Sequence, residues 1–372
     1  MKGDKLRLFH QIRMLSKHWN ICLISISEHE VSVDQKAVLE KYCSEVHVFR
    51  LSKWSRSASM SKNLMSATPF QVSYFYNKGI HQSLKDIVAR FRPDLAYFQL
   101  IRTALYAQDL GIPCVLDYMD SFSTIAKRDA DLSSGVRKYI FATEAKRVHA
   151  FEKKIAENFA GKTIISENDK NLLGIPDLKV ISNGVDVNHF KPTRDIKEFD
   201  ICFVGNLGYS PNQRAAEILV KKIMPRLLFK KPDISLLIAG ARPSNKVKSL
   251  SSSNISVMAD LEDIRKAYCL SRVFVAPIFS GAGQQNKILE AMAMGLPCVT
   301  SSIVNSSIKA STEQIKIGFS IEDFVKCTID LLYDKNAYLE QQAQALELVK
   351  SQYSWSSQVD KLDQYLRSFI KE

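Results

Sequence analysis

Residues 272–302 read RVFVAPIFSGAGQQNKILEAMAMGLPCVTSS and carry the clearest structural signal in the chain. A β-branched and aromatic run, Val273–Pro277, predicts a strand that enters a glycine-containing loop at residues 280–283. The amphipathic segment from about Gln284 to Met294 predicts a helix, and Gly295 follows as a helix stop before the next apolar run. This order of strand, loop, helix and strand indicates a βα unit of a parallel sheet.

The same alternation extends outward through the chain in two series, so we expect an α/β fold with two Rossmann-like domains. The predicted strands of the first series are Ile21–Ser27, Val46–Leu51, Asp94–Leu100, Cys114–Tyr118, Lys162–Ser166 and Lys179–Ser182. Those of the second are Ile201–Gly205, Ile234–Gly240, Ile255–Met258, Val273–Pro277, Cys298–Ser301 and Ile315–Ser320. We predict domains at 1–190 and 199–350, and a C-terminal helix at 351–372 that packs back towards the first domain.

Loop 280–283 and the helix after it form a candidate anion site. The free N–H groups at a helix start favour an anion such as a diphosphate, and Lys287 adds a charge on the first turn. Glu290 faces the same side and could accept hydrogen bonds from sugar hydroxyls. The alternative is a solvated pair of charges. A dinucleotide fingerprint is incomplete because Asn286 stands where a third glycine is required.

Two further strand ends are candidate sites. The turn Gly205–Gly208 opens the second series, and a predicted helix with Arg214 in an early turn follows it, so this turn could contact a phosphate. Asp117 and Asp120 end the strand at Cys114–Tyr118, where they could bind hydroxyls or act in acid/base chemistry. Asp120 could equally cap the next helix.

Composition excludes several classes of protein. The chain of 372 residues has 46% hydrophobic and 24% charged residues, which is typical of a soluble globular protein, and the net charge of +12 favours polyanionic partners. It has no apolar run of ~18 residues and no signal peptide, so we expect a cytoplasmic protein. The seven cysteines and seven histidines show no metal-ligand spacing, and serine-hydrolase and P-loop motifs are absent. We therefore predict no metal and no cofactor.

At these motifs the sequence resembles the family 4 retaining glycosyltransferases of the GT-B fold, in which two Rossmann-like domains face a central cleft. It is most similar to the bacterial group associated with exopolysaccharide or exosortase-linked systems. The resemblance covers nearly the whole chain. It rests on GDKLRLFHQIRMLSK (3–17), ATPFQVSYFY (67–76), SNGVDVNHFKP (182–192), FVGNLGYSPN (203–212) and GAGQQNKILEAMAMGLPCV (281–299).

The resemblance implies metal-independent, retaining transfer from a nucleotide-sugar donor, expected to be a UDP-sugar, to an acceptor bound by the first domain. It implies that Glu290 binds the donor ribose and that Lys287 offsets charge on the departing diphosphate. We add Asp120 to these two as a catalytic candidate. The expected donor contacts are Gly205, Asn206, Gly208, Arg214, Gly281, Ala282, Gly283, Asn286, Lys287 and Glu290.

Three departures from the family pattern stand out. Ala282 occupies a position where many members carry a second glutamate, and the local sequence YMDS replaces a histidine in the first domain. Relatives also place a strand before the helix that begins near Asp4, so we expect that the chain as given has a shortened start.

The sequence thus predicts a glycosyltransferase that adds a sugar to a glycan or lipid-linked acceptor in surface polysaccharide synthesis. The alternatives are a nucleotide-sugar epimerase of the same fold and a catalytically silent donor-binding partner. We expect no nucleic-acid partner. We further expect contact with the inner face of an anionic membrane. The residues for that contact are Lys5, Arg7, Arg13 and Lys17 of the first helix, with Trp54, Arg56 and Lys62.

Overall fold

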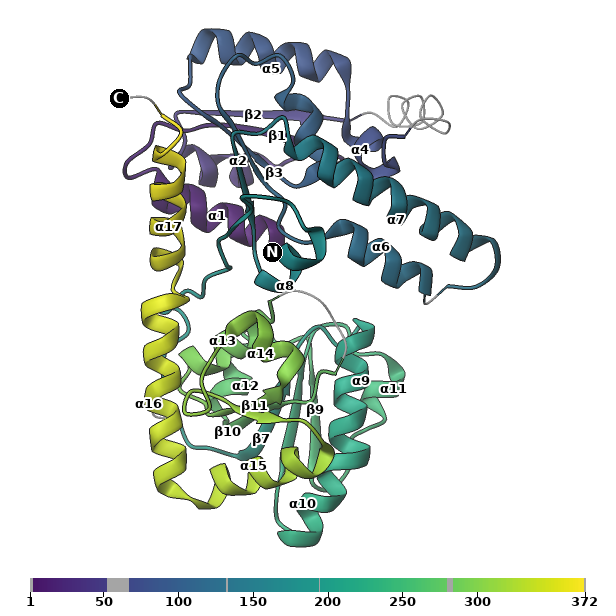
Figure 1. Ribbon diagram of the computed structural model, residues 1–372. Coiled ribbons are helices and arrows are strands. Elements are labelled where there is room, and N and C mark those ends of the chain that lie inside the picture. Colours follow the sequence, from purple (N-terminus) through teal and green to yellow (C-terminus); the bar gives the residue numbers. More distant parts are fainter. Residues whose placement is uncertain (1–2, 52–66, 132, 194, 280–283, 371–372) are drawn as a thin grey trace. The chain divides into compact units, whose positions relative to one another are not determined.

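A computed structural model describes residues 3–51, 67–131, 133–193, 195–279 and 284–370 (Figure 1). The chain divides into two compact units, each built on parallel strands. The first unit holds residues 1–182 and 359–372, and the second holds residues 183–358. Residues 183–190 lie with the second unit, in which Val185 pairs with Ser354.

The first unit has its parallel strands in two pieces. β1 (Cys22–Ser27) pairs with β2 (Glu45–Arg50), and a four-stranded piece has the order β3-β4-β5-β6. Within the described residues, no backbone pairing joins β1 to β3. The other strands are β3 (Ala96–Gln99), β4 (Cys114–Asp117), β5 (Gly161–Ile164) and β6 (Lys179–Val180). The helices are α1 (Gly3–Leu15), α2 (Val33–Glu40), α4 (Phe70–Phe75), α5 (Lys78–Phe91), η1 (Ile101–Ala107), α6 (Phe122–Asp131), α7 (Gly135–Ala156) and α8 (Glu167–Leu173).

The second unit is one six-stranded parallel sheet in the order β12-β11-β10-β7-β8-β9. Its strands are β7 (Phe199–Val204), β8 (Leu236–Gly240), β9 (Ile255–Ala259), β10 (Ser271–Ala276), β11 (Cys298–Ser301) and β12 (Lys316–Gly318). Its helices are α9 (Ser210–Ile218), η2 (Leu219–Ile223), α10 (Met224–Lys230), α11 (Asn245–Lys248), α12 (Arg265–Cys269), α13 (Asn286–Ala293), α14 (Ser302–Ile308), α15 (Ile321–Tyr333) and α16 (Lys335–Gln352). The last helix, α17 (Trp355–Arg367), passes from the second unit into the first. All twelve strands predicted from the sequence are present.

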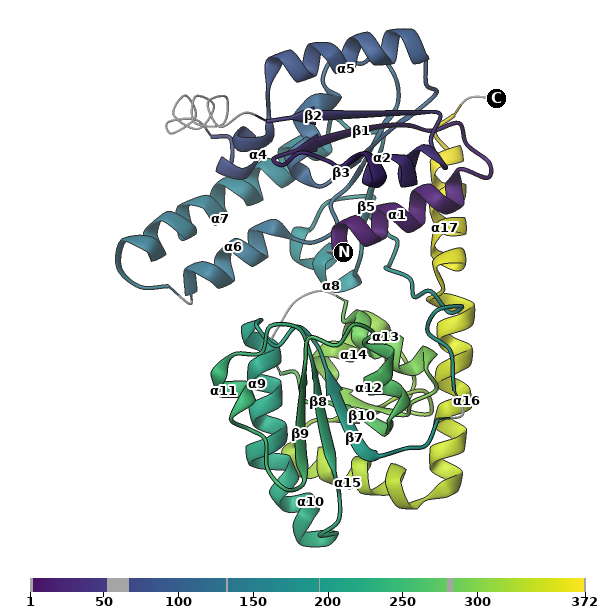
Figure 2. The same cartoon turned by 180° about the vertical axis from the view of Figure 1, so that it is seen from behind.

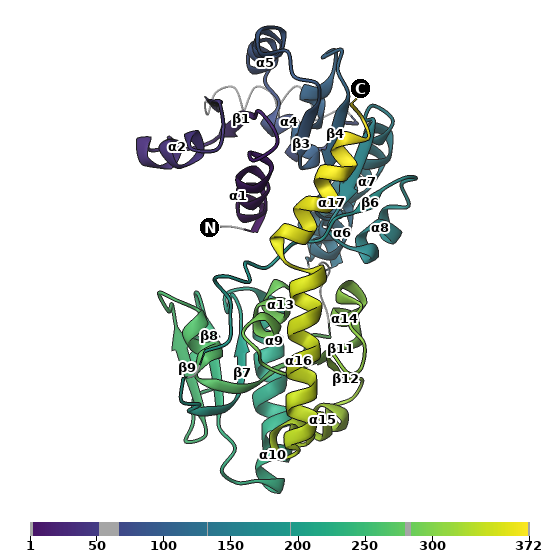
Figure 3. The ribbon, with the colours of Figure 1, turned by 90° about the vertical axis from the view of Figure 1, so that its left-hand side faces the viewer.

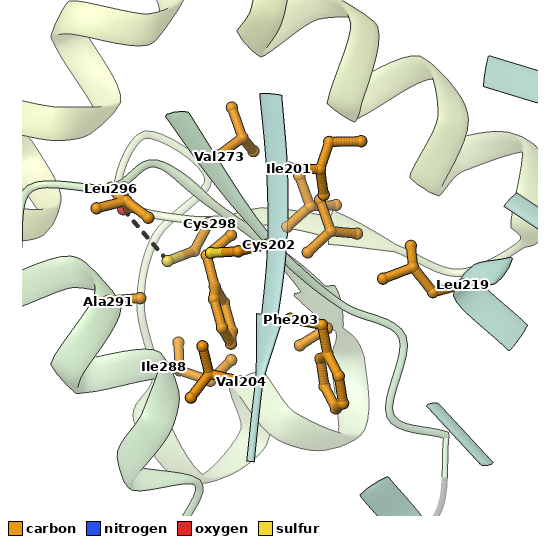
Figure 4. Packing of buried hydrophobic residues seen from close by; sticks show 14 of the residues in the cluster. Ile201, Cys202, Phe203, Val204, Leu219, Val273, Ile288, Ala291, Leu296 and Cys298 are labelled. Carbon is orange, nitrogen blue, oxygen red and sulfur yellow. Dashed lines mark hydrogen bonds between the residues drawn. The ribbon is translucent and has the colours of Figure 1, made fainter. Parts of the chain in front are cut away.

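Side chains on both faces of β7 are buried in the core of the second unit. Figure 4 shows Cys202 and Val204 of β7 on the side of Ile288 in α13, whereas Phe203 points to the opposite side of the strand. All four side chains are at most 3% exposed. Helices therefore cover both faces of this sheet, as the near-continuous apolar strands require. In Figure 3 α13 also lies beside α16, against which it packs.

The end of α13 follows the glycine signal in the sequence. Gly295 has a φ of +75°, a left-handed conformation that a residue with a Cβ adopts at a cost. A Cβ added there would lie 3.1 Å from the Pro192 side chain. The helix therefore ends just before this residue, and the chain turns directly into β11. None of the helices in the described residues combines the length and apolar character that a bilayer crossing requires.

Candidate functional site

The turn after β7 is fixed by hydrogen bonds around Asn206 and Asn212. The Gly208 N–H donates to the Asn206 side chain at 3.1 Å, and Asn212 Nδ2 donates to the Asn206 carbonyl at 2.9 Å. Gly240 at the end of β8 has a φ of +149°, and a Cβ there would lie 1.7 Å from the Gly205 carbonyl oxygen. Only glycine permits this approach, which brings the ends of two central strands together.

The side chain of Lys287, in the first helical turn of α13, reaches the loop at Gly205–Gly208 that follows β7. Its ammonium donates to Asn212 Oδ1 at 2.5 Å and lies 5.4 Å from the centre of the Phe203 ring. A Cβ added at Gly205 would be 3.2 Å from Lys287 Nζ. The structure thus brings together Gly205, Asn206 and Lys287, three of the expected donor contacts, through Asn212. Burial lowers the pKa of the Lys287 ammonium to about 8, and the Glu290 carboxylate partly offsets this effect.

Glu290 lies one turn further along α13 and is bound by a tyrosine. The hydroxyl of Tyr268, on α12, donates to Glu290 Oε2 at 3.0 Å and also lies 3.3 Å from the Lys287 carbonyl oxygen. Tyr268 is wholly buried. Burial raises the pKa of Glu290, while the Tyr268 hydrogen bond and the Lys287 charge oppose that rise. The result is a carboxylate and an ammonium held at one helix start.

The segment that leads into α13 is anchored by the Gln284 side-chain amide, which forms two hydrogen bonds with the backbone of Asn183. Asn183 N–H donates to Gln284 Oε1 at 2.8 Å, and Gln284 Nε2 donates back to the Asn183 carbonyl at 3.1 Å. Among the described residues, the buried Oδ1 of Asn286 has no hydrogen-bond partner. An oxygen of this kind can accept a hydrogen bond from a ligand.

The structure does not place the other predicted donor contacts beside Lys287 and Glu290. Arg214 lies exposed on α9, and in the described part of the chain it makes no hydrogen bond to Lys287 or Glu290. Gly281, Ala282 and Gly283 lie outside the described residues. Asn212, Tyr268 and Phe203 contribute to the site without having been predicted. FVGNLGYSPN contains Phe203 and Asn212, so the motif could have pointed to those two.

In the first unit, Asp117 is a structural residue. Its carboxylate is wholly buried and forms an ion pair with Arg7 Nε at 2.8 Å. It also accepts hydrogen bonds from the Tyr97 hydroxyl at 2.7 Å and from Met119 N–H at 3.1 Å. Because Arg7, Tyr97 and Met119 occupy this carboxylate, the prediction that Asp117 binds the hydroxyls of a ligand or acts in acid/base chemistry is wrong. Arg7, which is 1% exposed, was also wrongly predicted to face a membrane.

Asp120 follows β4 and is not a helix cap. Ser121 caps α6 instead, because its Oγ accepts the Thr124 N–H at 3.3 Å. Burial raises the pKa of Asp120 to about 6, with help from the nearby carboxylates of Asp169 and Asp117. An acid with such a pKa is a suitable proton acceptor near neutral pH.

Two further buried acids lie near the start of α6. Glu152 Oε1 accepts the Ser123 N–H at 3.3 Å, and Asp169 Oδ2 accepts the Ser166 hydroxyl at 2.5 Å. Both side chains are at most 1% exposed. Burial raises the pKa of Glu152 to about 7 and that of Asp169 above its usual range. Both acids hold the start of α6, and Asp169 also contributes to the raised pKa of Asp120.

One other group of polar side chains lies close enough to share a cation. The ligand atoms of Cys22, Glu45 and His47 lie within 4.8 Å of one another on β1 and β2. Arg90 already forms an ion pair with Glu45, and Glu45 accepts a hydrogen bond from His47 at 2.7 Å. The cation beside Glu45 in this structure is therefore a guanidinium group.

Residues 198–334 match the family model of glycosyl transferases group 1. A relative from Klebsiella pneumoniae, an uncharacterized 44.6 kDa protein in the cps region, is 24% identical over 90% of this chain and 87% of its own length. The matched residues all lie in the second unit, and the match confirms the predicted enzyme class.

Solved structures share the fold over the whole chain. A glycosyltransferase from Rickettsia africae aligns with a TM-score of 0.70 and 13% identity over 100% of this chain and 97% of its own. HepE of Anabaena in complex with UDP and glucose aligns with a TM-score of 0.67 and 14% identity, over 99% of this chain and 96% of its own. Sucrose-phosphate synthase from Thermosynechococcus elongatus aligns with a TM-score of 0.66 and 14% identity, over 98% of this chain and 92% of its own. These likenesses confirm the GT-B fold class.

Proposed function

We propose that this protein is a retaining glycosyltransferase that moves a sugar from a UDP-sugar to a glycan or lipid-linked acceptor in surface polysaccharide synthesis. The group 1 domain and the fold support transfer of a sugar. UDP as the donor nucleotide is supported by HepE, which was solved with UDP and with UDP-glucose. The cps-region relative supports a role in polysaccharide synthesis.

The observation that carries the proposal is the position of the Lys287 ammonium, held by Asn212 against the Gly205 turn. In glycosyl transfer, the bond between the sugar and the diphosphate breaks, and negative charge develops on the departing diphosphate. A cation already placed in a partly desolvated site stabilises that charge without further reorganisation. Lys287 therefore acts on the leaving group. We propose that it removes the need for a metal ion, so that EDTA leaves transfer unchanged.

Glu290 binds the donor ribose in this proposal. Its carboxylate has four acceptor sites, and Tyr268 uses only one oxygen. The second oxygen can accept a hydrogen bond from a ribose hydroxyl. Donor binding keeps Glu290 ionised, because a hydroxyl that donates to the carboxylate favours its charged form.

The remaining donor contacts surround these two residues. We propose that Asn286, whose buried oxygen has no partner among the described residues, binds the donor. The backbone at Gly281, Ala282 and Gly283 and the Asn206–Gly208 turn would contact the diphosphate. Arg214 would reach the donor from α9.

We propose that Asp120 binds the acceptor hydroxyl in the first unit. A carboxyl with a pKa of about 6 is ionised at neutral pH and can accept a hydrogen bond from that hydroxyl. For a lipid-linked acceptor, the protein would work in the cytoplasm at the inner face of the membrane.

The test is transfer by purified protein from a panel of UDP-, GDP- and ADP-sugars to a lipid extract, with the product anomer read by NMR. We expect transfer from a UDP-sugar with retained configuration. Lys287→Met and Glu290→Gln should slow transfer by about 100-fold or more, whereas the exposed Lys248→Met should not. Free sugar released without acceptor would favour an epimerase, and donor binding without turnover would favour a silent partner.

A further inference from the structure

The first two turns of α7 carry apolar side chains that the first unit leaves in water. Val136, Tyr139 and Ile140 are 77%, 81% and 51% exposed. Residues 134–141 are all exposed, which includes Phe141. Figures 1 and 2 show α7 packed beside α6 in a hairpin whose far end extends away from the strands of its unit. No folding role accounts for apolar residues at this position.

These side chains form a stripe on the outward face of the helix. Val136, Tyr139 and Ile140 have the i, i+3, i+4 spacing that places residues on one side of an α-helix. The buried positions of α7, Ala145 and Val148 among them, lie roughly opposite at about 100° per residue. The stripe therefore cannot belong to the core that the rest of α7 completes.

Positive charge accompanies the stripe. Arg137 and Lys146 are exposed and flank the stripe, at about 100° and 80° from Val136 on either side of it, whereas Lys138 lies on the opposite side of the helix. Between residues 133 and 143 the sequence contains no Asp or Glu. The whole chain carries a net charge of +12. A surface with exposed aromatic and aliphatic groups beside basic groups is complementary to anionic lipid headgroups over acyl chains.

We propose that residues 135–141 of α7 dock on an anionic lipid bilayer. Val136 and Ile140 enter the boundary between headgroups and acyl chains, the Tyr139 ring lies at the same level, and the flanking Arg137 and Lys146 pair with lipid phosphates. Two signals, apolar insertion and charge, give a binding that neither gives alone. This inference rests on the proposed function in one respect, since a lipid-linked acceptor requires such an encounter. It replaces the α1 surface, in which Arg7 is buried.

The experiment is vesicle co-sedimentation of the full chain with phosphatidylcholine vesicles that contain about 30% phosphatidylglycerol. Tyr139→Ser/Ile140→Ser should weaken binding by about tenfold or more, because two exposed apolar groups no longer insert. Arg137→Glu/Lys146→Glu should weaken it at least as much, and most at low salt. Phe229→Ser is the matched control, since Phe229 is 91% exposed beside Lys230 and Lys231 in the second unit.

Wild-type binding to anionic vesicles, retained by Phe229→Ser and lost in both α7 variants, would establish the docking surface. Circular dichroism and thermal midpoints should be unchanged, because the altered side chains are exposed. Equal binding by all variants would overturn the proposal. A wild-type dimer that Tyr139→Ser/Ile140→Ser converts to a monomer, without vesicle binding, would also overturn it in favour of a second copy.

Binding of UDP in solution separates this inference from the proposed function. Both α7 variants should bind UDP as the wild type does, because the second unit is untouched. Vesicle binding without any sugar transfer would refute the function and leave the docking surface standing. Transfer to a water-soluble acceptor without vesicle binding would do the reverse.

Discussion

Replacing Lys287 by Met should stabilise the unliganded protein while it removes donor binding. The pKa of Lys287 falls from 10.5 to about 8 on folding. A difference of about 2.5 units, at about 1.4 kcal/mol each, means that keeping the ammonium charged at pH 7 costs the fold about 3 kcal/mol. Met is similar in length and carries no charge, so this cost disappears.

Part of that gain is offset at Asn212 and at Glu290, whose buried carboxylate loses the nearby ammonium. The substitution leaves Asn212 Oδ1 without its 2.5 Å partner, and a buried unsatisfied acceptor costs about 1–2 kcal/mol. We therefore expect a net gain of about 1 kcal/mol for Lys287→Met.

The pH dependence gives the sign of the effect. The folded protein binds its Lys287 proton less tightly than the unfolded chain does, so its stability rises as pH increases from about 8 to 10.5. Below about pH 8 the ammonium is charged in both states, so the full cost of burying it is present and stability no longer changes with the titration of Lys287. Lys287→Met should lose this rise, and the exposed Lys248→Met should keep it.

Urea unfolding at several pH values measures both features, and calorimetric titration with UDP measures donor binding. Loss of one positioned charge at the leaving group should lower kcat by about 100- to 1000-fold. A Lys287→Met protein that is destabilised by more than about 1 kcal/mol, or that transfers sugar as the wild type does, would refute the reasoning.

Three further substitutions test the rest of the site and the first unit. Tyr268→Phe removes the hydroxyl that binds Glu290 and should raise the KM for the donor several-fold with the fold intact; an unchanged KM would contradict this. Glu152 has a folded pKa of about 7, above its unfolded value of 4.5, so its contribution to stability is lost as pH rises from about 4.5 through 7. Glu152→Gln should flatten that decline in urea unfolding, and an unaltered decline would exclude Glu152 as its source. Arg7→Met leaves Asp117 buried and unpaired and should cost about 3–5 kcal/mol of stability, whereas a loss below about 1 kcal/mol would mean that the pair contributes little.

The strands and α13 were predictable because their signals are local. Short β-branched runs become buried strands in any parallel α/β sheet, and Gly295 ends its helix through its own backbone conformation. Lys287 and Glu290 are three residues apart, so their shared helix start followed from the period of the helix alone.

The side of α1 that is buried was not predictable in the same way. Leu6, Phe9, Ile12 and Leu15 form its apolar face, yet the buried set is Arg7, His10, Gln11, Ile12 and Leu15. Helical period describes where apolar groups lie on a helix. It does not reveal a buried carboxylate such as Asp117, 110 residues away, that attracts a cation into the core.

The partners that define the site are also distant in sequence. Asn212 is 75 residues from Lys287, and Tyr268 is 22 residues from Glu290. Residue type and spacing along the chain were enough to indicate an anion site at the start of α13, because helix geometry and backbone N–H groups act within one turn. Whether a given charge meets a ligand, an amide or another buried charge depends on which strand ends the fold brings together. That is a property of packing, and it separates Lys287, held ready at the Gly205 turn, from Asp117, enclosed by Arg7 and Tyr97.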